Sequence, residues 1–465
     1  MVRTADQSVK ESHAPQGHTV LFRADTGATV TLNATATRIW RGSARGLPLA
    51  QIAGAMASCY RVPLRVAQAD ARRLVRRLTR RGFLVSAARG AAPAHARVVA
   101  PSGSGPLGVD ISLTGACNAS CSYCAYAPQM CSRRDLPTAE WLAFFAELGR
   151  LPTRNVTLSG GEVFLRPDLW DLIDGIVEHG LRYSILTNGS RLDRRTVQRF
   201  DESRRRVRLD SIQVSLDGST ARVHERTRGA GTFGPAVRAL RLLHDAGLPV
   251  TCRVTVNRHN VGDLANIAGF LLDNVGLRSF GTNEATPQGR GFVNRDEVTL
   301  RPEQRVQAMR TLSALARRYP GRVLAMAGPL AQARVFAAMR AARAGRAAAP
   351  PGAGRLTACG CVFARMAVLH DGAMVPCSLL PHLHMGRINR DSVSRVWRGH
   401  RYLQALRNRR AIALARVPGC ETCEWARVCN GGCPALACEL TGHTNRANPL
   451  DCYRLFLQET RGVAR

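Results

Sequence analysis

The run Thr-Gly-Ala-Cys-Asn-Ala-Ser-Cys-Ser-Tyr-Cys, residues 114–124, places Cys117, Cys121 and Cys124 at CxxxCxxC spacing. Three thiolates so close together can hold three irons of a 4Fe–4S cluster, whereas such clusters normally take four cysteines. The missing fourth ligand indicates an iron reserved for a small molecule. The alternative is a zinc site, which favours CxxC pairs and a fourth Cys or His nearby. No histidine lies near this run, so the spacing favours the cluster.

Three further motifs follow this run at regular intervals. Each is an apolar strand that ends in small polar residues: Val156–Glu162, which ends in Gly-Gly-Glu, Ile185–Gly189, and Ile212–Gly218. Between them, short apolar strands alternate with helical patterns, as in Ala139–Leu148 and Phe233–Ala246. This alternation is typical of βα units around a parallel sheet, whose ligands bind at the C-terminal ends of the strands. We therefore expect an α/β fold.

The cysteine run and the three motifs, in this order, resemble the signature of the radical SAM superfamily. The resemblance implies a partial (β/α)6 barrel of the TIM type and a 4Fe–4S cluster whose open iron chelates S-adenosylmethionine (SAM). It places Tyr123 against the adenine and Glu162 on the SAM amino group through a charge-assisted hydrogen bond. Gly160 and Gly161 would allow close backbone approach. The remaining positions carried over as SAM contacts are Thr187, Asn188, Ser215 and Asp217.

Composition divides the chain into five segments. Residues 18–85 form an N-terminal unit, and residues 86–108 form a linker rich in Ala, Pro, Gly and Ser. The barrel motifs occupy residues 109–300, a helical connector with a second linker spans 301–354, and a cysteine-rich segment spans 355–460.

The cysteine-rich segment carries a second pattern. Cys420, Cys423, Cys429 and Cys433 fit CxxCxxxxxCxxxC, and four residues separate Gly372 from Cys377. The pattern resembles the SPASM domain, an iron–sulfur extension that carries two auxiliary 4Fe–4S clusters in radical SAM enzymes acting on peptides and proteins. By position, the resemblance implies one cluster on Cys359, Cys361, Cys377 and Cys433, and another on Cys420, Cys423, Cys429 and Cys452. Ligands so distant in sequence would couple folding to cluster loading.

Two of these ligand assignments stay open. Cys359 and Cys361 are separated by one residue, and either can be the first ligand. If only one of them binds, that cluster keeps an open iron. Cys438 competes with Cys452 for the last place in the other cluster, although the longer gap suits Cys452 better.

The N-terminal unit decides the expected class of substrate. Val20–Arg23 and Thr29–Asn33 have the pattern of two hairpin strands around a turn at Asp25–Gly27. Helical periodicity follows in three stretches, Ala34–Gly42, Pro48–Tyr60 and Arg65–Gly82.

This order of elements resembles the PqqD-like RiPP recognition element, a winged-helix fold that binds leader peptides of ribosomally made peptides. In that family the leader adds a strand to the edge of the sheet. The third expected helix is rich in arginine, which suits an acidic leader: Arg65, Arg72, Arg73, Arg76, Arg77, Arg80 and Arg81. The same excess also fits a general codon bias.

The whole-chain charge of +33 raises the question of a nucleic-acid partner. Lys10 is the only lysine, and the arginines are spread along an alanine- and glycine-rich chain, as GC-rich codon usage produces. The aromatic interleaving of a single-strand binder is missing. We therefore expect no nucleic-acid partner.

The expected compartment is the cytoplasm, where thiols stay reduced and cysteine motifs indicate metal rather than disulfides. Met1–Gly17 is polar, without the apolar core of a signal peptide. No apolar run reaches the length needed to span a bilayer, so we expect no membrane partner.

Together the resemblances imply a radical SAM oxidoreductase that modifies a ribosomally synthesised precursor peptide with a leader segment. A low-potential donor such as flavodoxin or ferredoxin would supply the electron for reductive cleavage of SAM. The resulting 5′-deoxyadenosyl radical would abstract a substrate hydrogen, and the auxiliary clusters would accept the surplus electron or ligate a substrate thiolate. The expected product is an intramolecular thioether or carbon–carbon crosslink.

Three other functions compete with this hypothesis. A formylglycine-type, sulfatase-maturing oxidase typically has an aspartate after the SPASM cysteine, where this chain has Ser378. A peptide epimerase needs a hydrogen donor, usually a thiol such as Cys131, Cys252 or Cys438. An iron–sulfur winged-helix regulator would bind DNA through phosphate contacts, but a sensor has no use for the Gly-Gly-Glu motif.

Overall fold

The fold is taken from a computed structural model that describes residues 3–6, 9–13, 19–23, 26, 28–86, 97–98, 103–130, 134–357 and 359–460, without the side chains of 3, 4, 12, 13, 97, 98 and 361. Its centre is a sheet of ten strands in the order β13-β12-β11-β10-β9-β8-β7-β14-β15-β16. All neighbours from β13 to β14 are parallel. The barrel strands are β7 (Gly108–Thr114), β8 (Asn155–Gly160), β9 (Arg182–Thr187), β10 (Leu209–Ser215), β11 (Val250–Val256), β12 (Phe280–Glu284) and β13 (Val323–Ala325).

Helices cover the outer face of this sheet and complete the βα units. In α5 (Thr138–Arg150), Trp141, Phe144, Phe145 and Leu148 are fully buried, and their spacing gives the helix one apolar face against the strands. The other long helices are α6 (Leu169–Glu178), α10 (Phe233–Asp245), α14 (Pro302–Arg318) and α15 (Pro329–Arg343). Shorter ones are α4 (Ala127–Met130), α7 (Arg194–Gln198), α8 (Arg205–Arg208), α9 (Ala221–Arg228), α11 (Leu264–Gly269), α12 (Arg290–Val293) and α13 (Arg295–Val298). The expected partial (β/α)6 barrel is confirmed.

The cysteine-rich segment shares the sheet of the barrel. Strand β14 (Arg365–Val368) pairs in parallel with β7, and β15 (Ala373–Val375) and β16 (Gly386–Arg387) continue the sheet antiparallel. Arg365 fastens the junction by donating to Asp110 at 2.6 Å and to Thr157 at 2.9 Å. The helices of this segment are α16 (Cys361–Ala364), α17 (Val393–Gly399), α18 (Arg401–Asn408), α19 (Pro434–Thr441) and α20 (Tyr453–Glu459).

The connector expected at residues 301–354 contains more than helices. Strand β13 lies within it and pairs in parallel with β12, so the barrel sheet extends past residue 300. Three residues are too few to show a strand periodicity, which is why the sequence interpretation missed them.

The N-terminal lobe combines a small sheet, in the order β4-β3-β2-β6, with three helices. Its elements are β1 (Arg3–Ala5), β2 (Val9–His13), β3 (Thr19–Arg23), β4 (Thr29–Leu32), α1 (Ala34–Ala44), α2 (Leu49–Tyr60), α3 (Leu64–Arg80), β5 (Leu84–Ser86) and β6 (Arg97–Val98). The expected hairpin and helices are therefore present, although the turn residues Asp25 and Gly27 lie outside the described residues.

Strand β2 was not expected from the polar N-terminal sequence. Its Glu11 is buried, and the carboxylate accepts hydrogen bonds from Trp40 Nε1 and Arg41 Nε, each at 2.8 Å. A buried carboxylate with such partners is tolerated, so a polar strand can lie on the lobe's core.

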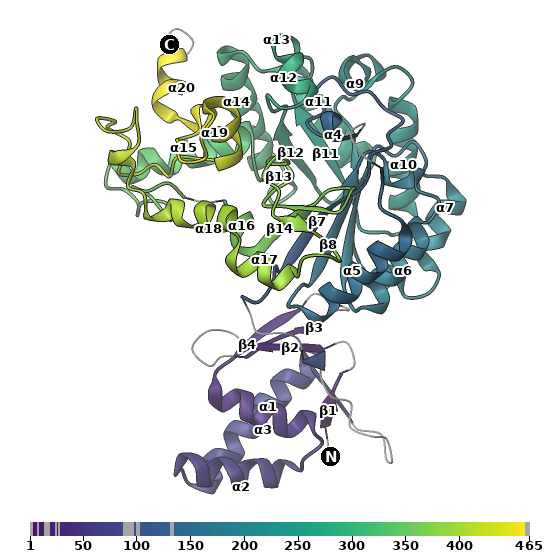
Figure 1. Cartoon of the computed structure of the whole chain (residues 1–465), viewed down its shortest axis with the longest axis vertical. Coiled ribbons are helices and arrows are strands. Elements are labelled where there is room, and N and C mark those ends of the chain that lie inside the picture. The colour runs from purple at the N-terminus through teal and green to yellow at the C-terminus, as the bar shows by residue number, and fades with distance from the viewer. Residues whose placement is uncertain are drawn as a thin grey trace.

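The lobe lies at the end of the barrel where the strands begin. Figure 1 shows β2, β3 and β4 between the barrel and the helices α1–α3. The guanidinium carbon of Arg154, one residue before β8, lies 5.2 Å from the centroid of the Phe22 ring on β3. Among the helices that the structure describes, none combines the length and apolar character needed to cross a bilayer.

Candidate functional site

The three cysteines of the opening motif lie in the loop that follows β7. They line one cavity of about 400 Å³ together with residues from the ends of the neighbouring strands. Among the predicted SAM contacts, that lining includes Tyr123, Gly160, Gly161, Thr187, Asn188 and Ser215. The structure thus gathers the C-terminal ends of β7 to β10 around the cysteines, as the parallel arrangement requires.

The glycines of the Gly-Gly-Glu turn allow the cysteine loop to pass directly over it. Gly160 has φ +114°, in the region that side chains disfavour, and a Cβ on Gly161 would lie 2.0 Å from the carbonyl oxygen of Ala116. The peptide N–H of Gly161 donates to Thr114 and that of Glu162 donates to Ala116, both at 2.8 Å. These contacts fix the position of Cys117, the residue that follows Ala116.

The Glu162 side chain lies behind the cavity rather than in its lining. Its carboxylate is fully buried and accepts from Thr187 Oγ1 at 2.7 Å, the Asn188 N–H at 2.7 Å and the Phe164 N–H at 3.2 Å. Burial raises its pKa, and these hydrogen bonds oppose that rise. In this structure Glu162 holds the end of β9 against the end of β8, and its contact with the SAM amino group stays a prediction.

Asp217 is likewise fully buried and organises the loop after β10. Its carboxylate accepts from Arg228 Nε at 2.5 Å, from the Thr255 N–H at 2.7 Å and from the Tyr123 hydroxyl. The guanidinium carbon of Arg228 lies 5.6 Å from the Tyr123 ring centroid. Burial raises the pKa of Tyr123 well above its usual value, so the ring remains a neutral phenol. Asp217 and Arg228 therefore fix the aromatic ring expected to face adenine.

The remaining anchors of the cysteine loop come from stretches of sequence far apart from it. The Ser122 N–H donates to Thr227 at 2.8 Å, and the Arg290 N–H donates to Cys124 at 3.0 Å. A Cβ on Gly289, which has φ +56°, would lie 2.6 Å from the Cys124 carbonyl oxygen. The loop is therefore held by backbone contacts that need no bound metal.

The thiols of this loop influence one another. Burial raises the pKa of Cys117 and Cys121, and Cys124 raises both further, whereas Arg228 lowers them. Buried neutral thiols must lose their protons to bind iron, so loading is expected to release protons. Three thiols around one cavity fit a cluster with an open position, and the cavity's volume suits a small molecule.

Four C-terminal cysteines come together as the second predicted set. Burial raises the pKa of Cys420 to about 11, and the nearby Cys429, Cys452 and Cys423 thiols raise it too. Cys438 is not among the thiols that act on the pKa of Cys420 or Cys429, and its own Sγ lies 3.8 Å from Nε2 of His382. The structure thus brings Cys452, and not Cys438, to the other three.

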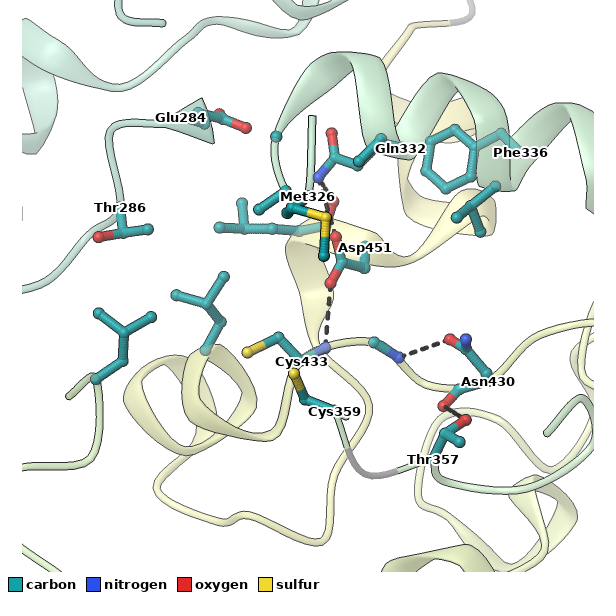
Figure 2. Close-up of a pocket in the computed structure, with 18 of the residues that line it drawn as sticks. Glu284, Thr286, Met326, Gln332, Phe336, Thr357, Cys359, Asn430, Cys433 and Asp451 are labelled. Atoms are coloured by element: carbon teal, nitrogen blue, oxygen red, sulfur yellow. Dashed lines mark hydrogen bonds between the residues drawn. The ribbon is translucent and has the colours of Figure 1, made fainter. Parts of the chain in front are cut away.

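The first predicted set is described only in part. Cys359 and Cys433 line a cavity of about 440 Å³ shown in Figure 2. Burial raises the pKa of Cys433, and the nearby Cys359 thiol raises it further. Cys377 packs, partly buried, against the barrel core together with Cys433. The side chain of Cys361 lies outside the described residues, so the choice between Cys359 and Cys361 stays open.

The two cavities meet at the end of β12. Both are lined by Glu284, Ala285, Thr286, Ala327 and Leu379. The Glu284 carboxylate is buried and accepts from Arg305 at 2.6 Å. Arg305 and Gln332 both donate to the Leu450 carbonyl. Gln332 also donates to the Asp451 carboxylate, and that carboxylate accepts from the Cys433 N–H at 3.2 Å (Figure 2). A hydrogen-bonded chain therefore connects the barrel end with the cysteine loop.

Some residues of the site belong to no motif that the sequence shows. Tyr126, which lines the first cavity, bonds through its hydroxyl to Nδ1 of the buried His370 at 2.7 Å, and burial raises its pKa to about 12. Tyr126 and His370 are 244 residues apart, so only the pairing of β14 with β7 brings them together. Glu284 likewise gave no signal beyond its place at the end of an apolar strand.

Within the described residues, no group of three or more His, Cys, Asp and Glu side chains converges closely enough to hold a single metal ion. Of the thiols proposed for an epimerase, Cys252 is fully buried in the barrel and outside the lining of both cavities. Cys131 lies outside the described residues.

Comparisons with known proteins agree on all three segments. The family model of the radical SAM superfamily matches residues 111–271. The model of coenzyme PQQ synthesis protein D (PqqD) matches residues 18–84, and that of SPASM, an iron–sulfur cluster-binding domain, matches residues 359–424.

Individual relatives cover most of the chain. The mycofactocin maturase MftC of Mycobacterium ulcerans (strain Agy99) is 29% identical over 333 residues, which are 71% of this chain and 83% of that protein. The PqqA peptide cyclase of Ruegeria pomeroyi is 27% identical over 352 residues, 74% of this chain and 87% of that protein.

A solved structure shares the fold of nearly the whole chain. Streptococcus suis SuiB bound to its precursor peptide SuiA matches with a TM-score of 0.66 and 12% identity, over 97% of this chain and 100% of that chain. SuiB is also known bound to S-adenosylmethionine. The chain belongs to the radical SAM enzymes that carry a SPASM domain, with a PqqD domain before the barrel and with SAM and 4Fe–4S clusters as its cofactors.

Proposed function

We propose that this enzyme forms an intramolecular thioether or carbon–carbon crosslink in a ribosomally synthesised precursor peptide. The single observation that carries the proposal is the lining that the two cavities share at Glu284, because it places the cavity of Cys117, Cys121 and Cys124 next to the cavity of Cys359 and Cys433. A crosslink removes two hydrogens from the peptide, one as an atom and one as a proton, and leaves one electron over. A space between a SAM site and an auxiliary site suits that stoichiometry.

When bound at the cavity, SAM and its cluster supply the radical that removes a hydrogen from carbon. The chain's own residues orient and shield that chemistry. Tyr123, fixed by Asp217 and Arg228, forms one wall, and the ends of β8 and β9 form another. Glu284 is the ionisable side chain at the junction of the cavities, within reach of a proton leaving the second reacting group.

Two features of the N-terminal lobe favour a peptide as the substrate. Strand β4 ends the order of its sheet, and no described strand pairs with its outer edge, whereas β6 covers the other edge. Arg81, at the end of α3, donates to the Thr29 carbonyl of β4 at 3.0 Å, so the arginine-rich helix lies beside that edge. A leader strand added to β4 would meet an arginine-lined groove that includes Arg73, Arg76 and Arg77.

The position of the lobe sets a minimum length for the peptide. The lobe contacts the beginning of the barrel strands, whereas the cavities lie at their C-terminal ends. Strand β7 has seven residues, so the two ends are separated by about 20 Å at roughly 3.3 Å per residue. The docked leader segment and the modified residue must therefore be separated by at least about six extended residues.

The test uses a candidate precursor peptide with a leader segment, anaerobically reconstituted enzyme, SAM and a reduced flavodoxin or ferredoxin as the proposed electron donor. Mass spectrometry should show a peptide that lacks two hydrogens, with fragmentation blocked between the joined residues. The variant with Ala at Cys117, Cys121 and Cys124 should leave the peptide unchanged. An unchanged mass with inverted stereochemistry, or a Cys or Ser converted to formylglycine, would overturn the crosslink proposal.

A second measurement separates leader binding from chemistry. Fluorescence anisotropy of the labelled leader should show weaker binding to the R73Q/R76Q/R77Q variant and a steep loss with added salt, because exposed charges are screened. The E424Q variant, which changes a distant exposed charge, serves as the control. Unchanged leader affinity in the arginine variant would exclude the groove as the docking site.

A further inference from the structure

Arg409 is a fully buried arginine in the SPASM segment, and the described residues offer it no carboxylate. Among the side chains with less than 2% exposure it is one of the largest. It belongs to no ion pair between described residues, although burying an unpaired cation is normally unfavourable. A buried charge that is kept without an acidic partner needs another source of negative potential.

The guanidinium lies between the two loops that bear the cysteines. Its Nη1 donates to the Thr357 carbonyl and its Nη2 to the Arg446 carbonyl, each at 3.1 Å. Thr357 is two residues before Cys359, and its N–H donates to the carbonyl of Asn430, beside Cys429, at 2.9 Å. Its hydroxyl donates to the same carbonyl at 3.2 Å (Figure 2). The Nε atom has no hydrogen-bond partner within the described residues.

The charged group that acts on the pKa of Arg409 is Cys433, a predicted cluster ligand. Burial lowers the pKa of Arg409 to about 10, and the Cys433 thiolate acts against that fall. At neutral pH the guanidinium therefore remains charged. Two backbone carbonyls satisfy part of its hydrogen bonding but supply no net charge, so the geometry leaves its charge uncompensated without the cluster.

We propose that Arg409 is the buried cation that balances the auxiliary cluster held through Cys433 and raises the reduction potential of that cluster. Iron–sulfur clusters on thiolates carry net negative charge, and net charge and burial are among the factors that set their potentials. Reduction adds a negative charge, and in a poorly screened interior a nearby cation stabilises the reduced state more than the oxidised one. Arg409 is thus a positioning residue for electron transfer, whichever peptide the enzyme modifies.

The experiment is a redox titration of the full-length, anaerobically reconstituted chain, followed by electron paramagnetic resonance. It uses a background with Ala at Cys117, Cys121 and Cys124, so that only the auxiliary clusters contribute. We expect R409Q to move the midpoint of one cluster to a more negative potential and leave the other unchanged. R409K, which keeps the charge, should retain the parent midpoint.

The matched control is R410Q, which removes the same charge from an exposed neighbour and should shift neither midpoint. A fully loaded R409Q with parent midpoints, or an R409K shifted like R409Q, would overturn the proposal. If R409Q loses about four irons while R409K keeps them, the charge is required for loading and the proposal stands. Loss of iron in both variants would assign Arg409 a packing role only.

Discussion

The two cysteine regions differ in what holds them in place. Cys117, Cys121 and Cys124 lie within one short loop at the end of β7, whose Val109, Ile111 and Leu113 are fully buried in the large barrel core. The C-terminal cysteines are spread from residue 359 to residue 452, between turns and short helices.

Their local packing reflects this difference. Two clusters of buried apolar residues pack against the second cysteine set. One consists of Leu356, Leu414 and Val417, and the other of Met309, Phe336, Met339, Trp425, Val428 and Tyr453. Both are far smaller than the barrel core, which also holds Met366, Val368 and Met374 of the SPASM segment. We infer that the barrel forms its cysteine loop before iron arrives, whereas the part of the SPASM segment after residue 408 depends on iron to fold.

The largest expected effect is on catalysis. Replacing Cys117, Cys121 and Cys124 by Ala should abolish 5′-deoxyadenosine release and lower the iron content from about twelve to about eight per chain, because one of the three proposed clusters is lost. The thermal unfolding of the barrel should stay close to wild type. Chromatography of the nucleoside, an iron assay and calorimetry make the three measurements. A variant that unfolds would show that the loop of Cys117, Cys121 and Cys124 also depends on its cluster, so the two cysteine regions would not differ in their need for iron.

The second expected effect is structural. C429A should lose about four irons and speed backbone amide exchange across residues 409–452, which follow the part of the SPASM segment that packs on the barrel core, at least about 100-fold. That change corresponds to about 3 kcal/mol of local stability. Exchange in β7 to β12 should change little. Cys59 is exposed and far from the clusters in sequence, so C59A is the matched control and should keep all of the iron. Equal exchange in both variants would mean that the SPASM segment folds without its cluster.

A third change tests whether backbone contacts alone form the loop that bears Cys117, Cys121 and Cys124. G161A places a Cβ 2.0 Å from the Ala116 carbonyl oxygen and should lower the free energy of unfolding by about 3 kcal/mol, since neither strand end can move away easily. G234A is the control, because no atom lies within 4 Å of the added Cβ. Chemical denaturation of the metal-free proteins measures both. A neutral G161A would remove the argument for a preformed loop.

The last effect is absent at neutral pH and appears only in acid. The Asp217 N–H donates to Nδ1 of the buried His224 at 3.0 Å, and burial lowers the histidine pKa from 6.5 to about 4. A base whose pKa is depressed by folding stabilises the fold above pH 6.5 and loses that contribution as the pH falls through about 4. Wild type should lose about 3 kcal/mol more than H224N between pH 7 and pH 4. Wild type and H224N should be compared by denaturant unfolding at each pH. If their free energies of unfolding change in parallel with pH, the prediction is contradicted.

The sequence predicted what local patterns encode. The CxxxCxxC run, the Gly-Gly-Glu turn and the arginine-rich helix each lie in one short stretch, and the structure places each on the expected type of element. Tyr126 with His370, and Glu284 with Arg305, depend on contacts between distant segments and carry no local pattern. Strands β2 and β13 were missed because neither has a strand periodicity of its own, and pairing with β3 and with β12 makes them strands.

The pairing of β14 with β7 has a consequence for the order in which the protein can be completed on the ribosome. Asp110 bonds Arg365 across 255 residues, which take roughly 10 to 50 seconds to translate. During that interval the hydrogen-bonding edge of β7 is open, and open strand edges promote wrong association. A nascent chain of this enzyme should therefore be most vulnerable to aggregation after the barrel helices emerge and before Val368 does, and slow codons in that stretch would prolong the exposure.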